Sequence, residues 1–480
     1  MKIIKDTGIN LSSAVLNKIL RMLFAILLFR FATPDDISRY YIGIAIGSLL
    51  LLPIYGVVLG IINRYVPYYL GKKKDPSSLV LNALILLISY VLILIIILYI
   101  FKSFLFKFYP TFQPVFIFFI LQLINISIYK INFSLLNAFH KFKENLISTF
   151  IVNFVRLIGV SLFLLFYKHI TYEYVISSFI FSITLSTVYV LNIVKKEIKF
   201  KLDFSFNEKE LKNKLKYGIS TIFSDVRTYV LTRFDVLLLG IYTSSFVVSA
   251  YNLILTIVRG IIETLKQPLN QTLLPHMSKN VGENKDNKQL LNLSLKYSAY
   301  IFLFVYIFIF LAAKDLIALM SKKYTEFYSI AWLISLISLI GVFLSILLNY
   351  LKAIRWARPI FLSAIVGLSL NIVLDIIFIP THGVIGAIVS TLISLIAEII
   401  IVLFYVVQST KLEFNYLIKP FISFIIVFLL GILISNFIHY SFYINITLFS
   451  IYIGITLLIT LYLFEKEAIV HLLQLILIKQ

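Results

Sequence analysis

The chain has no cysteine, and charged side chains make up only 14% of its 480 residues. Without cysteine there is no disulfide framework, no thiolate metal site and no thiol nucleophile. An ordinary soluble domain carries roughly a quarter charged residues, whereas 60% of this sequence is hydrophobic and its mean hydropathy is +0.99. The shortage of charge therefore excludes an ordinary soluble protein and predicts an all-α polytopic membrane protein.

Long apolar runs alternate with short polar connections along the whole sequence. Segments 79–100 and 421–437 are apolar on every side, so lipid or other helices must surround them. Spans of about 20 residues give about fourteen transmembrane helices. We expect them near 9–31, 40–62, 79–101, 114–138, 146–167, 173–194, 217–241, 248–270, 290–312, 328–350, 359–379, 384–407, 418–437 and 445–464. The N-terminal segment has no small-residue cleavage site, so we expect it to be kept as the first helix.

Acidic residues are scarcer than basic ones, 22 against 43, and the formal net charge is +21. Lysine and arginine gather in alternate connections, including 71–75, 195–216 and 278–288, whereas the intervening connections are nearly free of them. The positive-inside rule then predicts a multi-pass protein of the cytoplasmic membrane with both termini in the cytoplasm. The positive charge reflects this topology and does not indicate binding of nucleic acid.

The two halves of the sequence resemble each other after a shift of about 210 residues. Segment 70–75, LGKKKD, matches 281–286, VGENKD, and 134–139, SLLNAF, matches 346–351, ILLNYL. Chance similarity between apolar segments is the alternative, and the shared glycine and aspartate argue against it. Because the shift is an even number of helices, the halves should be related by a pseudo-twofold axis along the membrane normal. The predicted parts are an N-terminal six-helix bundle (1–194), a charged cytoplasmic linker (195–216), a C-terminal six-helix bundle (217–407) and two additional helices (408–480).

Segments 31–75, 235–280 and 370–394 resemble the corresponding stretches of polysaccharide transport flippases of the O-antigen type. That family belongs to the multidrug/oligosaccharidyl-lipid/polysaccharide superfamily, together with lipid II flippases and MATE drug exporters. The resemblance implies a MATE-like fold, in which two six-helix bundles surround a V-shaped central cavity. It also implies that a lipid-linked sugar crosses the membrane by alternating access.

Two arginines fall close to the predicted bilayer midplane, on polar stripes of the first and eighth helices. Arg21 shares its stripe with asparagines, and Lys18 is its neighbour; Arg259 shares its stripe with Glu263 and Lys266. A cation at the midplane costs at least ~2.5 to 3.5 kcal/mol, so these side chains should face water or anions. Pairing of Arg259 with Glu263, one turn away, is the alternative.

Segment 224–240 carries four ionisable residues in an otherwise apolar helix: Asp225, Arg227, Arg233 and Asp235. At about 100° per residue, Asp225 shares a side with Arg233, and Arg227 shares the opposite side with Asp235. Each pair is about 12 Å apart along the axis, too far for a direct ion pair. One pair should face the cavity, and the other should pack within the bundle, with Arg156 or Asp375 as partners. The alternative is that all four form structural ion pairs.

The resemblance adds further candidates for the substrate site. In lipid II flippases, arginines of the first, second and eighth helices line the cavity. Arg21 and Arg259 lie on comparable helices here, and Arg64 lies at the cytoplasmic end of the second. Headgroup contacts are therefore expected from Arg21, Arg259, Lys18, Arg64, Arg227, Arg233 and Lys266. Coupling or structural ion pairs are expected from Asp225, Asp235, Glu263 and Glu398.

No cofactor or metal is expected, because no two histidines have metal-ligand spacing and no GxxxxGK[ST] motif occurs. Coupling to H⁺ or Na⁺ remains open. One alternative is an exporter of another amphiphile, of the lipid II or MATE type, although the first helix lacks the acid typical of MATE exporters. Another is a polytopic glycan polymerase or glycosyltransferase, for which Asp35 and Asp36 are the only adjacent external acids. Expected partners are a lipid-linked glycan, membrane lipids and a glycan polymerase or ligase.

Overall fold

The computed structural model shows an almost entirely helical chain. It describes residues 2–139, 141–197, 226–227, 229–410, 412–413, 415–436 and 441–477. Within these ranges there is no β-strand, and one isolated β-bridge joins Ala32 to Ile170. Eleven helices of the described part are long and apolar enough to cross a membrane. This confirms the predicted all-α polytopic membrane fold. Most of the predicted linker lies outside the described residues.

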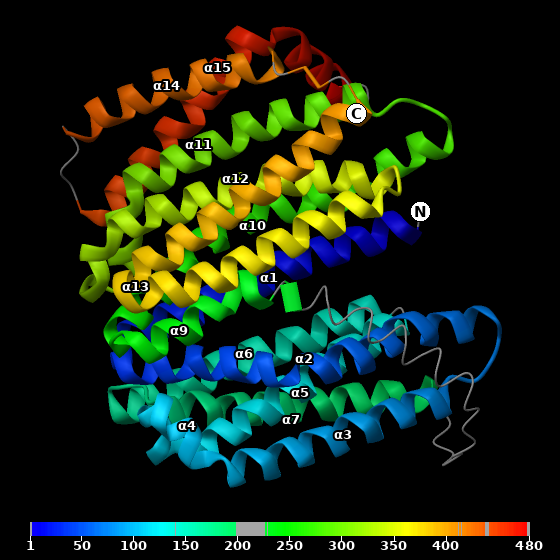
Figure 1. Ribbon diagram of the computed structural model, residues 1–480, viewed down its shortest axis with the longest axis vertical. Helices are drawn as coiled ribbons and strands as arrows, with labels where there is room; N and C mark the ends of the chain where they lie inside the picture. Colours follow the sequence, from blue (N-terminus) through cyan, green and yellow to red (C-terminus); the bar gives the residue numbers. More distant parts are fainter. Residues whose placement is uncertain are drawn as a thin grey trace. The chain divides into compact units, whose positions relative to one another are not determined.

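The chain forms two compact units, residues 1–249 and 250–480. The first unit contains α1 (Lys2–Phe31), α2 (Pro34–Gly71), α3 (Ser77–Ile100), α4 (Lys102–Phe108), η1 (Pro110–Val115), α5 (Phe116–Ala138), α6 (Phe142–Tyr167), α7 (Tyr172–Glu197), the π-helix η2 (Val230–Phe234), α9 (Asp235–Tyr242) and the first turn of α10 (Ser245–Gly282). Within this unit α2 packs against α3 and α5, and α7 packs against α5 and α6 (Figure 1). The predicted boundaries of the two six-helix bundles remain predictions.

Polar contacts fix α1 against α6 in the first unit. The Asn17 amide donates to the Thr149 hydroxyl at 3.0 Å, and the Asn153 amide donates to the Asn17 oxygen at 2.9 Å. These side chains are buried, so each hydrogen bond satisfies groups that would otherwise be costly to place inside the protein. Asn17 therefore has a structural partner, although its stripe on α1 also contains Arg21.

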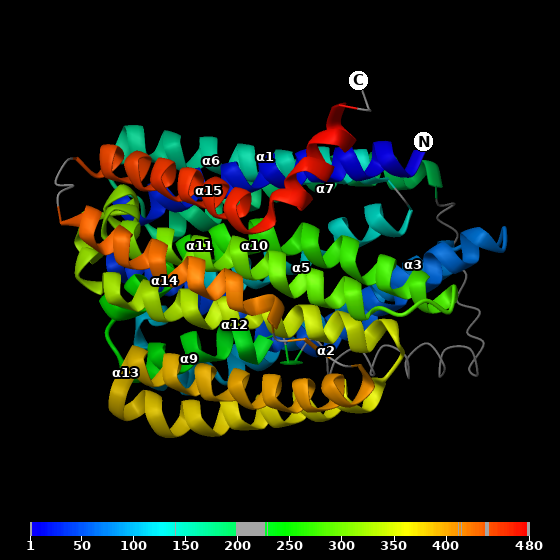
Figure 2. The ribbon, with the colours of Figure 1, turned by 90° about the horizontal axis from the view of Figure 1, so that it is seen from above.

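The second unit continues α10 and adds α11 (Lys288–Met320), η3 (Lys322–Phe327), α12 (Tyr328–Ala353), α13 (Ala357–Ser409), α14 (Asn415–Ser435) and α15 (Phe442–Leu477). Gly383, with φ 54°, divides α13 into two helical arms. The two arms match the two separate spans predicted for this segment, 359–379 and 384–407. Glycine adopts this backbone conformation without the strain that a Cβ atom would cause. Helices α14 and α15 pack on α11 (Figure 2), around a core formed by Tyr300, Phe304, Ile307 and Val427.

The internal repeat is visible in the bounds and caps of the helices. Helices α2 and α10 both have 38 residues, and η1 and η3 both have six. The connections that follow α2 and α10 also share a conformation: Lys73 and Asn284 have φ values of 56° and 55°. In each connection an aspartate then accepts a hydrogen bond from a backbone N–H two residues later, Asp75 from Ser77 and Asp286 from Lys288. The matching sequences therefore adopt matching local structures.

Candidate substrate cavity

A cavity of about 820 Å³ lies inside the first unit. Its walls come from α1, α2, α5, α6, α7 and the segment around η2. The residues that line it are Arg21, Tyr40, Ile44, Ser48, Leu52, Tyr55, Leu59, Asn63, Arg64, Gln122, Ile126, Tyr129, Lys130, Arg156, Phe179, Tyr229, Thr232 and Arg233. A space of this size is in the range of sites for small molecules or single sugar units.

The charge of this lining has one sign. Among the described lining residues five are basic, Arg21, Arg64, Lys130, Arg156 and Arg233, and none is an aspartate or a glutamate. Between low-dielectric walls such a set of cations produces a strong positive potential, which raises the local concentration of anions. The cavity therefore has the electrostatics of an anion-binding site.

Helix α2 supplies the longest wall of the cavity. Its lining residues recur every three or four positions from Tyr40 to Asn63, and Arg64 follows directly. They are Tyr40, Ile44, Ser48, Leu52, Tyr55, Leu59, Asn63 and Arg64. Residues at this spacing share one face of an α-helix. From Tyr40 to Arg64 the face extends about 36 Å along the helix axis. The sequence carried this signal, yet of these residues only Arg64 was predicted to belong to the site.

Gln122 of α5 is held in a fixed position at the Tyr40 end of the cavity. Its amide nitrogen donates to the Tyr40 carbonyl at 3.1 Å, and its oxygen accepts from the Tyr172 hydroxyl at 2.7 Å. The Gln122 side chain can occupy this position because residue 43 is glycine. A Cβ atom at residue 43 would collide with the Gln122 oxygen. The close approach of α2 and α5 therefore depends on the absence of a side chain at residue 43.

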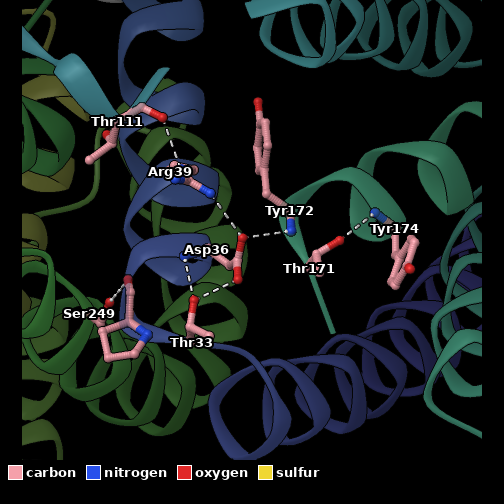
Figure 3. A network of polar contacts seen from close by, with 9 residues as sticks. Thr33, Asp36, Arg39, Thr111, Thr171, Tyr172, Tyr174 and Ser249 are labelled. Carbon is pink, nitrogen blue, oxygen red and sulfur yellow. Dashed lines mark hydrogen bonds and ion pairs between the residues drawn. The ribbon is translucent and has the colours of Figure 1, made fainter. Parts of the chain in front are cut away.

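A polar network lies around the start of α2, in the same part of the unit (Figure 3). The Thr33 hydroxyl caps the helix by accepting from the Asp36 N–H at 3.2 Å. The Asp36 carboxylate accepts from Arg39 at 3.3 Å and from the Tyr172 N–H at 3.0 Å, and Arg39 also donates to the Thr111 carbonyl at 3.0 Å. Asp36 is only 6% exposed, and its contacts connect the starts of α2, α7 and η1. Its position is explained by this structural role.

Arg156 of α6 is the most enclosed cation of the cavity, with 8% of its surface exposed. Its guanidinium carbon lies 4.1 Å from the centre of the Phe24 ring and 5.2 Å from that of Phe179. Its only hydrogen-bond partner among the described residues is the Tyr40 hydroxyl, 3.4 Å from Nη1, and the buried Nε has none. The two aromatic rings thus hold a cation without neutralising it.

The structure brings part of the predicted site together. Arg21, Arg64 and Arg233 line one cavity, and Lys18 and Arg227 are not among its lining residues. Arg21 makes no hydrogen bond or ion pair with a described residue. Lys130, Arg156 and the polar residues of α2 and α5 were not predicted as substrate contacts. The roles of all these residues in function remain predictions.

The remaining predicted cations and acids of the eighth helix belong to the second unit. Lys266 forms an ion pair with Glu263 at 2.8 Å, three residues away on α10. That contact gives Glu263 a partner other than the Arg259 considered from the sequence. Arg259 is half-buried. That Arg259 and Arg21 face one shared cavity stays a prediction.

The helix that contains Arg227, Arg233 and Asp235 is less regular than the sequence suggested. Residues Val230–Phe234 form a π-helix, which has more residues per turn than an α-helix. The 100° per residue of a regular α-helix therefore does not apply across this segment, and the predicted pairing of side-chain directions stays a prediction. Arg233 faces the cavity, whereas Asp235 is only 4% exposed and accepts a hydrogen bond from the Val236 N–H at 2.7 Å. Asp225 lies outside the described residues.

Two further acids are buried in the second unit. Glu398 is 0% exposed and packs against Gly367 on the opposite arm of α13, where a Cβ atom would collide with its carboxylate. Asp375 is equally buried and accepts a hydrogen bond from the Ser390 hydroxyl. Among the described residues, no group of three or more histidine, aspartate or glutamate side chains is arranged to hold a metal ion.

The sequence matches the polysaccharide biosynthesis protein family over residues 3–281, more than half of the chain. This chain belongs to the polysaccharide biosynthesis protein family. A search among curated proteins finds no match. The match includes the whole first unit and the cavity inside it.

Solved structures with the same fold are transporters. The lipid II flippase MurJ, in an inward closed conformation, matches with a TM-score of 0.78 and 20% identity, covering 95% of this chain and 98% of that one. An inward-facing multidrug resistance MATE family transporter matches with a TM-score of 0.63 and 13% identity, covering 82% and 96%. A MOP superfamily transporter from Pyrococcus furiosus matches with a TM-score of 0.57 and 14% identity, covering 84% and 93%. The protein is therefore a multi-pass membrane protein with the fold of MOP superfamily transporters.

Proposed function

We propose that this protein is a flippase that moves a lipid-linked oligosaccharide from the cytoplasmic to the external leaflet of the cytoplasmic membrane. The glycan is joined to an isoprenoid through a phosphate or diphosphate. One observation carries the proposal: in a member of the polysaccharide biosynthesis family, the described residues that line the cavity include five basic side chains and no acidic one. The fold shared with the lipid II flippase MurJ supports it.

The physical problem for such a substrate is the loss of hydration in hydrocarbon. A phosphate headgroup and its sugars cannot leave water unless other polar groups replace their hydrogen bonds. Arginines do this well for phosphate, because the planar guanidinium donates two parallel, charge-assisted hydrogen bonds. The polar face of α2 offers further donors and acceptors for sugar hydroxyls. The isoprenoid tail remains in lipid while the headgroup occupies the cavity.

Transport then requires that the cavity open to each side of the membrane in turn. In the proposed cycle the two halves rock as rigid bodies, and Arg21 and Arg259 contribute to the same headgroup site. The distribution of lysine and arginine in the connections predicts that both termini lie in the cytoplasm. A glycan polymerase or ligase would then act on the delivered glycan outside.

The driving force of the cycle is proposed to be an ion gradient or the substrate gradient itself. Asp235 and Glu398 are nearly or completely buried, and a buried carboxylate can bind a proton or Na⁺ in one conformational state and release it in another. Both acids are therefore candidates for coupling to H⁺ or Na⁺. A structural role in helix packing is the alternative for each.

The cavity also bears on the two alternative functions. A MATE-type exporter of cationic drugs would be expected to attract cations, and a lining with five basic residues repels them. A glycan polymerase or glycosyltransferase would need an accessible catalytic acid. Asp36, one of the two external acids considered for that role, is buried in structural contacts. Both observations favour the flippase.

The direct test is export of the lipid-linked glycan by reconstituted protein. Arg21→Ala should reduce flipping at least tenfold without loss of folded protein, because it removes an anion contact in the cavity. Arg21→Lys should restore it only partly, since lysine lacks the bidentate fork. Arg30→Ala is the matched control, an exposed arginine on the same helix that does not line the cavity. Wild-type rates in Arg21→Ala would exclude headgroup recognition at this residue.

A further inference from the structure

We infer that Arg156 forms a separate anion subsite at the Tyr40 end of the cavity, for an oxyanion of the transported molecule. This inference rests on the proposed function, and it assigns to Arg156 a role that neither the sequence pattern nor the family match gives it. The oxyanion is either the carrier phosphate or a carboxylate of an acidic sugar.

The first argument is that no described residue supplies a counter-charge for this cation. Arg156 is 8% exposed, and among the described residues it contacts no carboxylate. Its Nε is buried without a hydrogen-bond partner. A buried charge and a buried unsatisfied donor both oppose folding, so a site that retains them is expected to gain a partner on binding.

A second buried cation of the same chain shows the usual solution. Lys296 of α11 is 9% exposed and also lies near aromatic rings, 5.6 Å from the Tyr297 centroid and 5.7 Å from that of Tyr416. Its ammonium, however, forms an ion pair with Glu465 at 2.5 Å. Lys296 is thus neutralised within the second unit, whereas Arg156 lines a cavity and has no such partner in the part of the chain that the structure describes.

The third argument is that the guanidinium is held in a fixed position. Phe24 of α1 and Phe179 of α7 lie within 4.1 and 5.2 Å of its carbon, and the Tyr40 hydroxyl lies at 3.4 Å. Contacts from three other helices restrict the long side chain, so little conformational entropy is lost when an anion binds. Such a preorganised donor is typical of a recognition site.

The fourth argument concerns what surrounds the cation. Gln122, fixed by the Tyr40 carbonyl and the Tyr172 hydroxyl, lines the same end of the cavity. Amide and hydroxyl groups beside aromatic rings suit a sugar that carries the anion, and Arg156 suits its oxygen atoms. Arg64 lies about 36 Å from Tyr40 along α2. The Arg156 subsite, at the Tyr40 end, is therefore separate from any contact that Arg64 makes at the other end.

The experiment measures the thermal unfolding of the purified full chain in detergent with three probes: sodium diphosphate, sodium glucuronate and neutral glucose. Wild-type protein should gain Tm with at least one anion and not with glucose. Arg156→Met should unfold at the wild-type temperature or higher without ligand, because an uncompensated buried charge is replaced by an apolar side chain. Its apparent Kd for the anion should be at least tenfold weaker. Arg358→Met, at an exposed arginine of α13, should change neither quantity.

The probes and variants separate the outcomes. If Arg156→Met loses affinity for diphosphate alone, the ligand is the carrier phosphate. If it loses affinity for glucuronate alone, the ligand is an acidic sugar. Arg156→Met that binds both anions as tightly as the wild type overturns the subsite, and the flippase stands if Arg21→Ala still stops export. A wild-type protein that responds to neither anion overturns both proposals. If Arg156→Met does not fold, Arg156→Lys decides: weaker anion binding supports the subsite, and unchanged binding refutes it.

Discussion

Replacement of Asp36 by alanine should destabilise the first unit strongly. The carboxylate is buried and accepts hydrogen bonds from the Arg39 guanidinium at 3.3 Å and from the Tyr172 N–H at 3.0 Å. Alanine leaves both donors without this acceptor and leaves the Arg39 cation uncompensated, which costs roughly 3 to 5 kcal/mol for a buried pair. Arg39 keeps some exposure and a contact with the Thr111 carbonyl, so we expect about 3 kcal/mol.

The assay is thermal unfolding of the full chain in detergent, followed by circular dichroism. For a unit of this size, about 3 kcal/mol corresponds to a decrease in Tm of about 6 to 12 °C. Asp36→Asn should lose less, because the amide oxygen still accepts from the Tyr172 N–H. Asp35→Asn is the matched control, since the neighbouring aspartate is exposed and should leave Tm unchanged.

The same measurement distinguishes a structural from a catalytic aspartate. A catalytic acid would lose activity on substitution while the protein kept its stability. If Asp36→Ala unfolds within about 1 °C of the wild type, the network around the start of α2 contributes little, and the explanation of this residue by its contacts is refuted.

Two further predictions concern close packing and buried charge. Gly43→Ala should lower Tm by several degrees, because the added Cβ atom collides with Gln122. Gly341→Ala, with open space around it, should raise stability by about 0.5 to 1 kcal/mol. Equal effects of the two substitutions in thermal unfolding would contradict the close packing of Gly43 against Gln122. Lys296→Met should lower the free energy of unfolding by roughly 3 to 5 kcal/mol, because it leaves Glu465 buried without its cation. Adding Glu465→Leu should recover most of that loss. Additive losses in the double variant would show that the pair is not coupled.

The fold could be predicted from the sequence because hydropathy, charge and repetition act over long stretches of chain. Apolar spans of membrane length and basic connections predict where the spans lie, but α2 and α10 continue 9 and 12 residues past their predicted ends at 62 and 270. Local deviations escaped the prediction. The π-helix at Val230–Phe234 and the 3₁₀-helices η1 and η3 arise from local backbone geometry, which hydropathy does not encode.

The site could be predicted only where one helix contains the signal. Arg21 is noticeable in the sequence as a cation in an apolar span, whereas Arg64 became a candidate through the resemblance to lipid II flippases; both line the cavity. The polar face of α2 has a readable spacing as well, and counting it would have added Tyr40 and Asn63 to the predicted site. The surroundings of Arg156 could not be predicted, since they require α1, α2, α6 and α7 to be placed together first.

The internal repeat allows the contacts of Arg156 to be compared with those of Asn371 in the second half. Arg156 and Asn371 each lie fourteen residues after the start of their helix, α6 or α13. Phe179 lies on α7, and Thr391 lies on the arm of α13 that follows Gly383. In both halves these positions are in contact: Arg156 lies over the Phe179 ring, and the Asn371 amide donates to the Thr391 hydroxyl at 3.4 Å. The repeated helix pair thus keeps the contact and changes its chemistry. In the second half a neutral pair is enough for packing, and the proposed anion subsite would account for the charge in the first half.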